Sequence, residues 1–382
     1  MRIAYICQFY KPVIGGVEEV IRELATRMVK EGHEVHVFTS DFDKTKRIKL
    51  KEETIDGVHV HRFPYLFALT QFAPFWPSLL WRFKGKFDVI HVHVFGHPFT
   101  FIGSLLAKTS KTPLIITTHC PWTDKFRTPL TKFFLFFSYN LNRLSFKWAD
   151  KIIAITPWEI SSIKKYGGSG DKIVVIPNGV NSFLLKKIEI NNFKKKYDIK
   201  GKMVLFFGRF NVTKGPDKLA IAGREIVQTR KDIYFVFVGP DEGIKSEVKK
   251  IISNQENMLL LDPIRDRKLV AEMYQAADIY VLPSYREGLP LTLFEAMASG
   301  LPIVASPVNG VPYEMEEPKN GFFVDYGDIE GLKRAILKIL DNPKLSRTIS
   351  KNNLAKSRDY DWEIIFRKTL NIYKSLVSKD KK

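Results

Sequence analysis

The sequence predicts an α/β protein with two doubly wound parallel sheets. Short runs of β-branched and aromatic residues alternate with segments of helical length, and this alternation ends near residue 180 and begins again near residue 203. The chain has 382 residues, more than one hydrophobic core usually serves, and 45% of them are apolar, as in ordinary globular proteins. We therefore expect two domains of similar construction.

The first half of the chain begins with a strand–helix–strand unit. Ile3–Phe9 and Glu34–Thr39 have the composition of strands, and Val17–Glu31 has helical periodicity. Gly32 then supplies a helix stop. Further strands are expected at Val58–Phe63, Val89–Val94, Leu114–Thr118, Lys151–Ile155 and Ile173–Ile176.

The second half repeats the pattern after a Pro-Asn-Gly turn at residues 177–179. We place the boundary there, so that residues 1–180 form the first domain and residues 181–359 the second. Ligands of such Rossmann-like sheets bind outside the carboxyl ends of the strands, and two facing domains would enclose a cleft. The expected strands are Met203–Phe207, Tyr234–Val238, Met258–Leu261, Ile279–Leu282, Pro302–Ala305 and Phe322–Val324.

The net charge and the small number of cysteines limit the classes of function that the protein can have. A net charge of +19 favours anionic partners such as nucleotide phosphates, acidic lipid surfaces or nucleic acid, and a solvated lysine-rich surface is the alternative. Cys7 and Cys120 are too few for a disulfide framework, which fits a cytoplasmic protein. Phe63–Trp81 and Val89–Ala107 carry no charged residue, but prolines and other breakers within them argue against membrane spans.

The segment Pro283–Gly300 places two carboxylates beside a short helix. Pro290 suits the first helical position, so Glu295 lies inside the helix and Glu287 in the loop before it. Amides at the helix N-terminus suit phosphate, whereas ionised carboxylates accept hydrogen bonds from hydroxyl groups. Together they suit a sugar diphosphate. The alternative is one glutamate on a surface loop and one paired across a helix.

Other residues with ligand-binding chemistry follow the first strand of each half. Arg209 and Lys214 lie five residues apart in a turn bounded by Gly208 and Gly215, where both cations can face one pyrophosphate. In the first half, the paired glycines Gly15 and Gly16 allow close approach of the backbone to a ligand, or form only a tight turn. They do not complete a dinucleotide fingerprint.

The sequence EGLPLTLFEAMASGLPIVA at residues 287–305 resembles the signature of family 4 of the retaining glycosyltransferases, which have the two-domain GT-B fold. The resemblance covers nearly the whole chain, including the sequence VIPNGV at residues 175–180 and the sequence YDW at residues 360–362. It implies that a last helix, about residues 360–382, returns to the first domain. It also implies a transferase of hexosyl groups from a UDP- or GDP-sugar, with no metal or other cofactor.

The resemblance assigns roles to individual residues. Glu287 would orient the sugar hydroxyls, Glu295 would bind the ribose, and His119 would hydrogen-bond the transferred sugar. Arg209 and Lys214 would stabilise the leaving diphosphate, and attack would occur on the same face of the sugar. Further contacts with the donor would come from Gly15, Gly16, Gly208, Gly288, Leu291, Thr292, Pro263 and Ile264.

Some positions depart from the family pattern or need another explanation. Asp262 and Asn309 stand where the family often has glycine, and Glu314 comes one residue late, which leaves the base and the sugar open. His91 and His93 alternate on one expected strand, but no acidic third ligand lies nearby in the sequence, so we expect no metal site.

The surface that binds the sugar acceptor is expected in an aromatic and basic segment, Phe126–Trp148. If this segment is one helix, an apolar stripe packs on the sheet and Phe136 needs another partner. Basic residues beside aromatics suit an interfacial helix, so this segment and Phe63–Trp81 are expected to dock on an anionic membrane that carries a lipid-linked or glycan acceptor. The alternative is an aromatic core with an internal acceptor pocket. The stripe consists of Leu130, Phe133, Phe137, Leu141, Leu144 and Trp148.

The resulting prediction is a cytoplasmic retaining glycosyltransferase of cell-envelope glycoconjugate synthesis, which could attach peripherally to the membrane. Two other functions stay open at this point. An epimerase or hydrolase of nucleotide sugars could share the fold, and the net charge of +19 would also suit a non-catalytic polyanion-binding protein. No RNA-recognition motif is present in the sequence, which disfavours nucleic acid as the partner.

Overall fold

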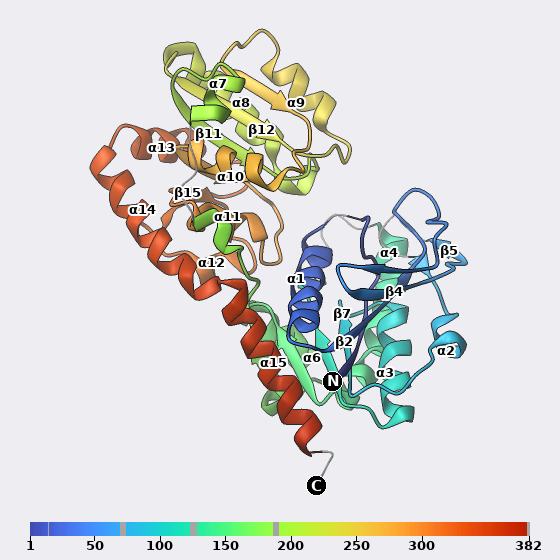
Figure 1. The fold of residues 1–382 in the computed structure, drawn as a ribbon. Helices are drawn as coiled ribbons and strands as arrows, with labels where there is room; N and C mark the ends of the chain where they lie inside the picture. The colour runs from blue at the N-terminus through green and yellow to red at the C-terminus, as the bar shows by residue number, and fades with distance from the viewer. Residues whose placement is uncertain (14, 69–73, 123–127, 186–190, 380–382) are drawn as a thin grey trace. The chain divides into compact units, whose positions relative to one another are not determined.

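The computed structural model describes residues 1–13, 15–68, 74–122, 128–185 and 191–379. The chain separates into two compact units (Figure 1). Unit 1 consists of Met1–Asn178 and Glu363–Lys382, and unit 2 consists of Gly179–Trp362. These limits differ by only two or three residues from the expected domain boundaries.

Unit 1 is built on a sheet with the strand order β10-β9-β8-β7-β1-β2-β4-β3. Neighbouring strands pair in parallel, except that β3 runs antiparallel to β4 at the edge. The direction of the strand order changes between β7 and β1, which creates a switch point at their carboxyl ends. The strands are β1 Arg2–Ile6, β2 Glu34–Ser40, β3 Glu52–Ile55, β4 Val58–Phe63, β7 Val89–His93, β8 Leu114–Thr117, β9 Lys151–Ala154 and β10 Ile173–Val175, and β5 Phe67–Ala68 pairs with β6 Pro74–Phe75 outside this sheet.

Helices from both ends of the chain complete unit 1. Tyr373 of the last helix is buried, and its hydroxyl lies 2.6 Å from Nδ1 of His91 in β7 and 3.1 Å from the hydroxyl of Tyr5 in β1. The last helix therefore contributes to the core of unit 1. The helices are α1 Gly16–Lys30, α2 Leu79–Arg82, α3 Pro98–Ser110, α4 Pro129–Leu141, α5 Arg143–Trp148, α6 Ile160–Lys165 and α15 Trp362–Lys379, with the 3-10 turns η1 Pro157–Glu159 and η2 Gly170–Lys172.

The prediction of one helix packed on the sheet through an apolar stripe was wrong. The segment is divided at Asn142 into α4 and α5, and the stripe residues Leu130, Phe133, Phe137, Leu141 and Leu144 are exposed. The helix α4 is instead fixed near its C-terminal end. Tyr139 is buried, with its hydroxyl 2.9 Å from the carbonyl of Pro121. Trp148 is half-buried, whereas Phe126 and Arg127 lie outside the described residues.

Unit 2 has a parallel sheet in the order β13-β12-β11-β14-β15-β16. In order of appearance along unit 2, this is the 3-2-1-4-5-6 arrangement of dinucleotide-binding folds, with its switch point between β11 and β14. Every strand expected in this half is present. The strands are β11 Lys202–Phe207, β12 Ile233–Val238, β13 Met258–Leu261, β14 Ile279–Leu282, β15 Ile303–Ala305 and β16 Gly321–Phe323.

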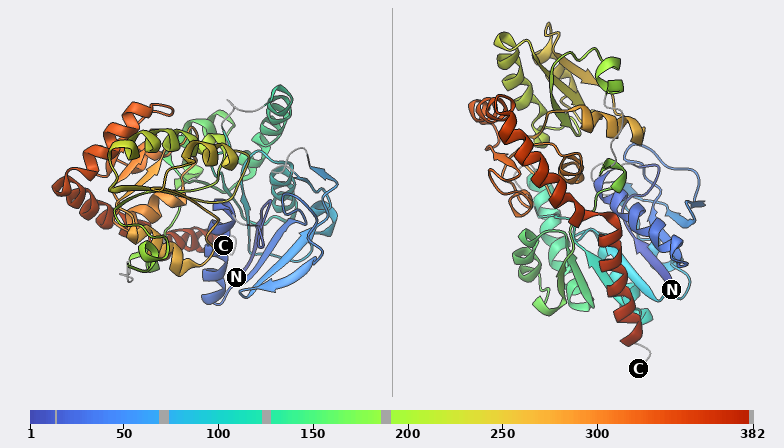
Figure 2. Two further views of the ribbon diagram at one scale, coloured as in Figure 1. Left: turned by 90° about the horizontal axis from the view of Figure 1, so that it is seen from above. Right: turned by 60° about the vertical axis from the view of Figure 1, so that its left-hand side comes forward.

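Helices cover both faces of this sheet (Figures 1 and 2). The core cluster on one face joins strand residues such as Phe206 to the helices α8, α9 and α13. On the other face, Tyr274 of α10 packs against Phe207 and Tyr280. The helices are α7 Asn191–Lys196, α8 Pro216–Thr229, α9 Lys245–Ile252, α10 Arg267–Ala276, α11 Leu291–Ala298, α12 Val311–Glu314, α13 Ile329–Leu340 and α14 Pro343–Ser357, with η3 Ser182–Leu185, η4 Val212–Lys214 and η5 Arg358–Tyr360.

The chain enters and leaves unit 2 through two segments that are hydrogen-bonded to each other. Val180 donates its amide to the carbonyl of Tyr360 at 2.7 Å, and Trp362 donates its amide to the carbonyl of Val180 at 3.2 Å. Gly179 lies against the indole ring of Trp362, where an added Cβ would come within 2.4 Å of a ring carbon. Glycine is therefore needed at this crossing because a larger residue would separate the two segments.

Candidate active site

The switch point of unit 2 holds a buried ion pair. Lys214 follows β11 and Glu287 follows β14, and Nζ of Lys214 lies 2.7 and 2.6 Å from the two carboxylate oxygens of Glu287. The Glu287 side chain is only 4% exposed, and Ser284 donates its hydroxyl to the same carboxylate at 2.7 Å. The two residues that the sequence placed far apart thus form one charged group where a ligand of this fold would bind.

The two loops that carry this pair are held together by their backbones. Tyr285 donates its amide to the carbonyl of Thr213 at 2.9 Å. Gly215 has φ +64°, and an added Cβ would lie 2.2 Å from the carbonyl oxygen of Pro283. Glycine at this position therefore permits both the left-handed backbone and the close approach of the loops. The geometry of the Lys214–Glu287 pair depends on this contact.

Glu295 occupies the neighbouring helix, as expected. The hydroxyl of Tyr274 donates to a carboxylate oxygen of Glu295 at 2.8 Å. Burial raises the pKa of Tyr280, and the charges of Glu287 and Glu295 raise it further. Tyr280 also hydrogen-bonds Thr292, in the first turn of the helix. Neither tyrosine could be predicted from the sequence, because an aromatic residue in a helix or strand gives no sign of which carboxylate it will reach.

The start of this helix differs by one residue from the prediction. Pro290 is the N-cap, and the helix begins at Leu291. Leu291 and Thr292 therefore form the beginning of its first turn, and Gly288 precedes it in the loop. Proline suits the cap as it suits the first turn, because its missing N–H would have no partner in either place.

Arg209 pairs with a carboxylate that was not expected from the sequence. Its guanidinium donates to both oxygens of Glu242 at 3.1 and 2.9 Å, and its side chain remains 42% exposed. A Cβ added at the preceding Gly208 would lie 3.4 Å from the ring of Phe206, which is its nearest described neighbour, so there is room for a side chain there. Strand pairing explains the contact with Glu242, because β11 and β12 are neighbours and both residues follow them.

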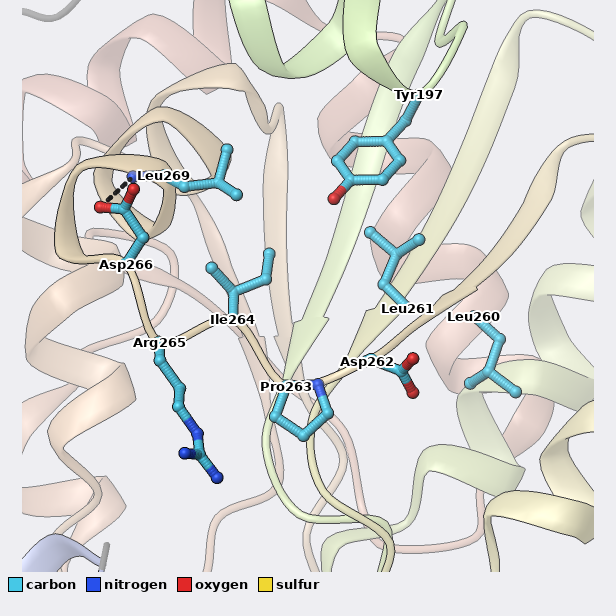
Figure 3. Close-up of a pocket in the computed structure, with 9 residues that line it drawn as sticks. All are labelled: Tyr197, Leu260, Leu261, Asp262, Pro263, Ile264, Arg265, Asp266 and Leu269. Atoms are coloured by element: carbon cyan, nitrogen blue, oxygen red, sulfur yellow. Dashed lines mark hydrogen bonds between the residues drawn. The ribbon is translucent and has the colours of Figure 1, made fainter.

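An open pocket of about 470 Å³ lies beyond the carboxyl end of β13. Figure 3 shows Pro263 and Ile264 among the lining residues, with the ring of Tyr197 above them and the guanidinium of Arg265 at the other end. Asp262 is exposed and pairs with Lys245 at 2.7 Å, and that hydrogen bond lowers the pKa of the Asp262 carboxyl. The departure from glycine thus adds a charged pair at the rim of this pocket.

The other two departures have structural explanations. Asn309 has φ +48°, a left-handed conformation that asparagine adopts more readily than most residues, and its side-chain amide donates to the carbonyl of Glu287. Glu314 is buried and accepts a hydrogen bond from the hydroxyl of Tyr360, and burial raises the pKa of its carboxyl. Asn309 therefore supports the Glu287 loop, whereas Glu314 anchors the segment by which the chain leaves unit 2.

In unit 1, the glycine loop follows β1 and opens α1. Gly15 is the N-cap of this helix, and its only close neighbour for an added Cβ is the flexible carboxylate of Glu18. An added Cβ at Gly16 would meet no described atom within 4 Å. Packing among the described residues therefore does not require glycine at Gly16. Ile14 lies outside the described residues.

His119 joins a column of buried histidines in unit 1. Nε2 of His119 lies 3.0 Å from Nδ1 of His93, and the ring of His93 is 4.1 Å from that of His91. His91 is bonded on both sides, to Thr117 and to Tyr373. Burial lowers the pKa of both His91 and His119 to about 3, so these rings are neutral at physiological pH.

The described residues include neither a cluster suited to a metal ion nor a helix suited to span a membrane. Among the described residues, no three side chains of histidine, cysteine, aspartate or glutamate gather in a way that could hold a metal ion. In the same part of the chain, no helix combines the length and the apolar character needed to cross a bilayer. Cys7 and Cys120 are both buried, and neither forms a disulfide bond with another described residue.

Comparison with known proteins gives matches over most of the sequence. The family model "Glycosyltransferase Family 4" matches residues 14–182, and the model "Glycosyl transferases group 1" matches residues 187–356. A phosphatidyl-myo-inositol mannosyltransferase of Mycobacterium leprae is 27% identical over 100% of this chain and 99% of its own length. The GPI3 subunit of a phosphatidylinositol N-acetylglucosaminyltransferase of Saccharomyces cerevisiae is 25% identical over 98% of this chain and 83% of its own length.

Solved structures match the fold over nearly the whole chain. Anabaena Alr3699/HepE in complex with UDP-glucose has a TM-score of 0.78 at 21% identity, and the match covers 98% of this chain and 100% of that one. WaaG, a glycosyltransferase involved in lipopolysaccharide biosynthesis, has a TM-score of 0.74 at 17% identity, with coverage of 97% and 99%.

The fold is the GT-B fold, and the protein is an enzyme that transfers a sugar from a nucleotide-sugar donor. The chain belongs to the group 1, family 4 glycosyltransferases. This assignment confirms the family and the fold that the sequence resemblance implied. It also excludes the non-catalytic polyanion-binding protein.

Proposed function

We propose that the protein is a retaining glycosyltransferase that moves a hexosyl group from a UDP- or GDP-sugar to a lipid-linked acceptor at a membrane. The observation that carries the donor part is the Lys214–Glu287 pair at the switch point of unit 2. A cation can meet the diphosphate there, while the carboxylate accepts hydrogen bonds from sugar hydroxyls. Epimerisation or hydrolysis of the donor is the alternative outcome.

In the proposed reaction, the bond between the anomeric carbon and the diphosphate oxygen breaks. The acceptor oxygen then bonds to the same face of that carbon, and its proton passes to the leaving phosphate. Lys214 and Arg209 stabilise the negative charge that develops on the diphosphate. Glu287 holds the sugar hydroxyls and Glu295 the ribose, while His119, as a neutral ring, hydrogen-bonds the transferred sugar.

The remaining donor contacts are proposed for residues around these side chains. The pocket at Pro263 and Ile264 would receive the nucleobase, since it lies at the same edge of the sheet as Arg209. Gly208 and Gly16 have space around them for a ligand, and Gly15 lies beside Gly16. Gly288, Leu291 and Thr292 precede or begin α11, whose first amides can face a phosphate.

The donor assignment is tested by thermal shift, and analysis of the products distinguishes sugar transfer from epimerisation or hydrolysis of the donor. The purified protein is mixed with UDP-glucose, UDP-N-acetylglucosamine, GDP-mannose or an ADP-glucose control. We expect one UDP- or GDP-sugar to raise the melting temperature, and the Lys214→Ala variant to lose most of that shift. The full rate of sugar transfer is expected in the presence of EDTA, because Arg209 and Lys214 supply the positive charge that a metal ion would otherwise supply. If the protein bound none of these nucleotide sugars, that result would contradict the proposal.

The acceptor part of the proposal is supported by an exposed apolar surface on unit 1. Phe133, Phe136 and Phe137 are 58%, 63% and 56% exposed, although their rings also contact one another. We call this the α4 surface, consisting of Leu130, Phe133, Phe134, Phe136, Phe137 and Leu141. Exposed aromatic patches of this kind mark sites of contact with proteins or membranes.

Three features favour a membrane over a protein partner for the α4 surface. Lys132 lies within the helix and is exposed, as suits contact with anionic headgroups. The uncharged segment Phe63–Trp81 also has exposed apolar residues, among them Phe67 and Trp81. The relatives from M. leprae and S. cerevisiae carry phosphatidylinositol in their names. The exposure of these phenylalanines disfavours the alternative, in which the aromatic segment forms an internal core.

Vesicle binding tests this part separately. The wild-type protein is expected to sediment with vesicles containing phosphatidylglycerol at low salt, and less with pure phosphatidylcholine vesicles. Replacement of Phe133, Phe136 and Phe137 by serine should abolish sedimentation, whereas Leu50→Ser, which changes another exposed apolar residue, should not. Equal binding by the triple variant would exclude the α4 surface, and a wild-type protein that ignores acidic vesicles would exclude membrane docking.

A further inference from the structure

The loop that carries His119 has an unusual backbone. It follows β8, and both His119 and Cys120 have left-handed conformations, with φ +57° and +52°. Residues other than glycine adopt this conformation infrequently, and consecutive residues in it must be held by their surroundings. The contacts that hold this loop therefore decide where the imidazole of His119 lies.

A buried carboxylate supplies two of those contacts. Glu159 is fully buried, and one of its oxygens accepts the amide of Cys120 at 2.6 Å. The other oxygen accepts the amide of Ile155, which follows β9, also at 2.6 Å. Thr118 adds a side-chain hydrogen bond to the same carboxylate. One side chain thus links the loops that follow two neighbouring strands of the sheet.

The local sequence explains how Glu159 reaches this position. Thr156 caps the turn η1, its hydroxyl accepting the amide of Trp158, and Glu159 is the last residue of that turn. The turn brings the carboxylate back over the end of β9, four residues after the amide of Ile155 that it accepts. A glutamate at this place has both oxygens occupied by backbone N–H groups, which a glutamine cannot reproduce because it has a single acceptor oxygen.

His93 restrains His119 from a second direction. Nδ1 of His93 lies 3.0 Å from Nε2 of His119, so one of these nitrogens carries the shared proton. Nε2 of His93 has no hydrogen-bond partner among the described residues. The backbone contact through Cys120 and the ring contact through His93 together fix both the position and the orientation of the His119 imidazole.

We propose that Glu159 is a positioning residue for sugar transfer, because its carboxylate holds the backbone of His119–Cys120 and so places the His119 ring against the transferred sugar. This inference rests on the role proposed above for His119. Glu159 touches neither substrate, so its effect on the reaction passes through His119. The donor affinity, which is proposed to come mainly from unit 2, depends little on it.

The experiment compares Glu159→Gln, His119→Ala and the double variant, with Asp150→Asn as a matched control. Asp150 also accepts a backbone amide, that of Leu114 at 2.8 Å, but at the amino end of β8, away from His119. The rate of nucleoside diphosphate release is measured with UDP-glucose and with GDP-mannose. We expect Glu159→Gln to lower kcat by about 10²-fold, as a small misplacement of a reacting group can. KM for the donor should change less than twofold, and the control should keep its kcat.

The double variant distinguishes positioning from a general loss of structure. If Glu159 acts through His119, the double variant is no slower than His119→Ala alone. A further 10²-fold loss in the double variant, or an equal loss of kcat in Asp150→Asn, would overturn the proposal.

Amide hydrogen exchange tests the same contact without turnover. Glu159→Gln should speed exchange at Cys120 and Ile155 by more than tenfold while leaving the amides of β1 unchanged. An unchanged rate at Cys120 would overturn the positioning role. If the wild-type protein turns over no donor while Glu159→Gln still shows the faster exchange, the proposed function is overturned instead, so the two failures are distinguishable.

Discussion

The candidate site in unit 2 is made of ion pairs, whereas the candidate site in unit 1 is made of neutral rings. Lys214 and Glu287 lie within 2.7 Å of each other, and Arg209 is paired with Glu242. In unit 1, His119 is bonded to His93, and burial keeps His119 uncharged. All eight histidines of the chain belong to unit 1.

We interpret this difference through the proposed donor, a nucleotide sugar, which has a charged diphosphate and an uncharged sugar. A diphosphate carries charge, and paired side chains hold their cations in place before the ligand arrives, so little reorganisation is needed. A sugar ring is uncharged, and a neutral imidazole can donate or accept a hydrogen bond without changing the net charge of the site. The two units are therefore expected to respond differently to substitution and to pH.

The largest effect is expected for Glu287→Gln. The substitution keeps the shape of the side chain but removes the charge that faces Lys214, and the sugar hydroxyls lose an ionised acceptor. We expect the rate of transfer to fall by about 10³-fold or more. Steady-state kinetics measures this change, and Glu330→Gln, an exposed glutamate on α13, is the control. Full activity in Glu287→Gln would disprove the assignment of the unit 2 site.

A somewhat smaller effect is expected for Lys214→Ala. It removes one of two cations from the diphosphate and leaves the buried Glu287 carboxylate without its partner. The rate should fall by about 10²-fold. The free energy of unfolding should also fall by about 3 kcal/mol, since a buried charge is left uncompensated. If only stability changes and kcat does not, Lys214 supports Glu287 rather than the reaction.

Much of the fold could be predicted from the sequence because parallel strands buried on both faces form continuous apolar runs. Strand β3 was missed, since Glu52–Ile55 is mostly polar and lies at the exposed edge of the sheet. The helix α4 was wrongly predicted to pack on the sheet, because its stripe is apolar. Its apolar stripe has helical periodicity, and periodicity alone does not state whether the partner is the sheet or something outside the chain.

The candidate site was predictable to the extent that motifs follow strands. Glu287, Glu295 and Lys214 follow or flank strands that meet at one edge of unit 2, so their proximity follows from the strand order. Glu242, the partner of Arg209, follows β12, and Tyr274, the partner of Glu295, lies in α10. Nothing in the local sequence around either residue indicates the pairing. Glu159 was missed as well, because its proposed role depends on the turn η1, which only the folded chain reveals.

The third effect is a pH dependence of stability confined to unit 1. The pKa of His91 and of His119 is about 3 in the folded protein, against an ordinary value of 6.5. Below pH 6.5 the unfolded chain takes up protons that the folded chain does not, so stability is full above 6.5 and declines as the pH falls toward 3. Each histidine contributes about 1.4 kcal/mol per pH unit within that window.

Hydrogen exchange at pH 6.5 and pH 5.5 can measure this decline in both units of one sample, with exchange rates corrected for the intrinsic effect of pH. Core amides of β7 in unit 1 should lose protection, whereas those of β11 in unit 2, which contains no histidine, serve as the internal control. An equal loss in both units would show that carboxylates, and not the buried histidines, govern stability in this range.

The smallest effect is expected for Glu242→Gln. Arg209 is 42% exposed, and ion pairs of exposed groups contribute about 1 kcal/mol or less. The affinity for nucleoside diphosphate should therefore weaken less than tenfold, as measured by calorimetry. An effect as large as that of Lys214→Ala would mean that the Arg209–Glu242 pair, despite its exposure, is as important as the buried one.

The route of the chain through the two units has a consequence for synthesis on the ribosome. Unit 2 is one continuous stretch, and it is complete before Glu363–Lys382 has been translated. Unit 1 lacks Tyr373 until then, so the hydroxyl that meets His91 and Tyr5 arrives last. Domains generally fold as units during translation, and the later part of this chain is therefore ready first. We therefore expect the surface of unit 1 that receives the final helix to stay exposed until that helix has been translated.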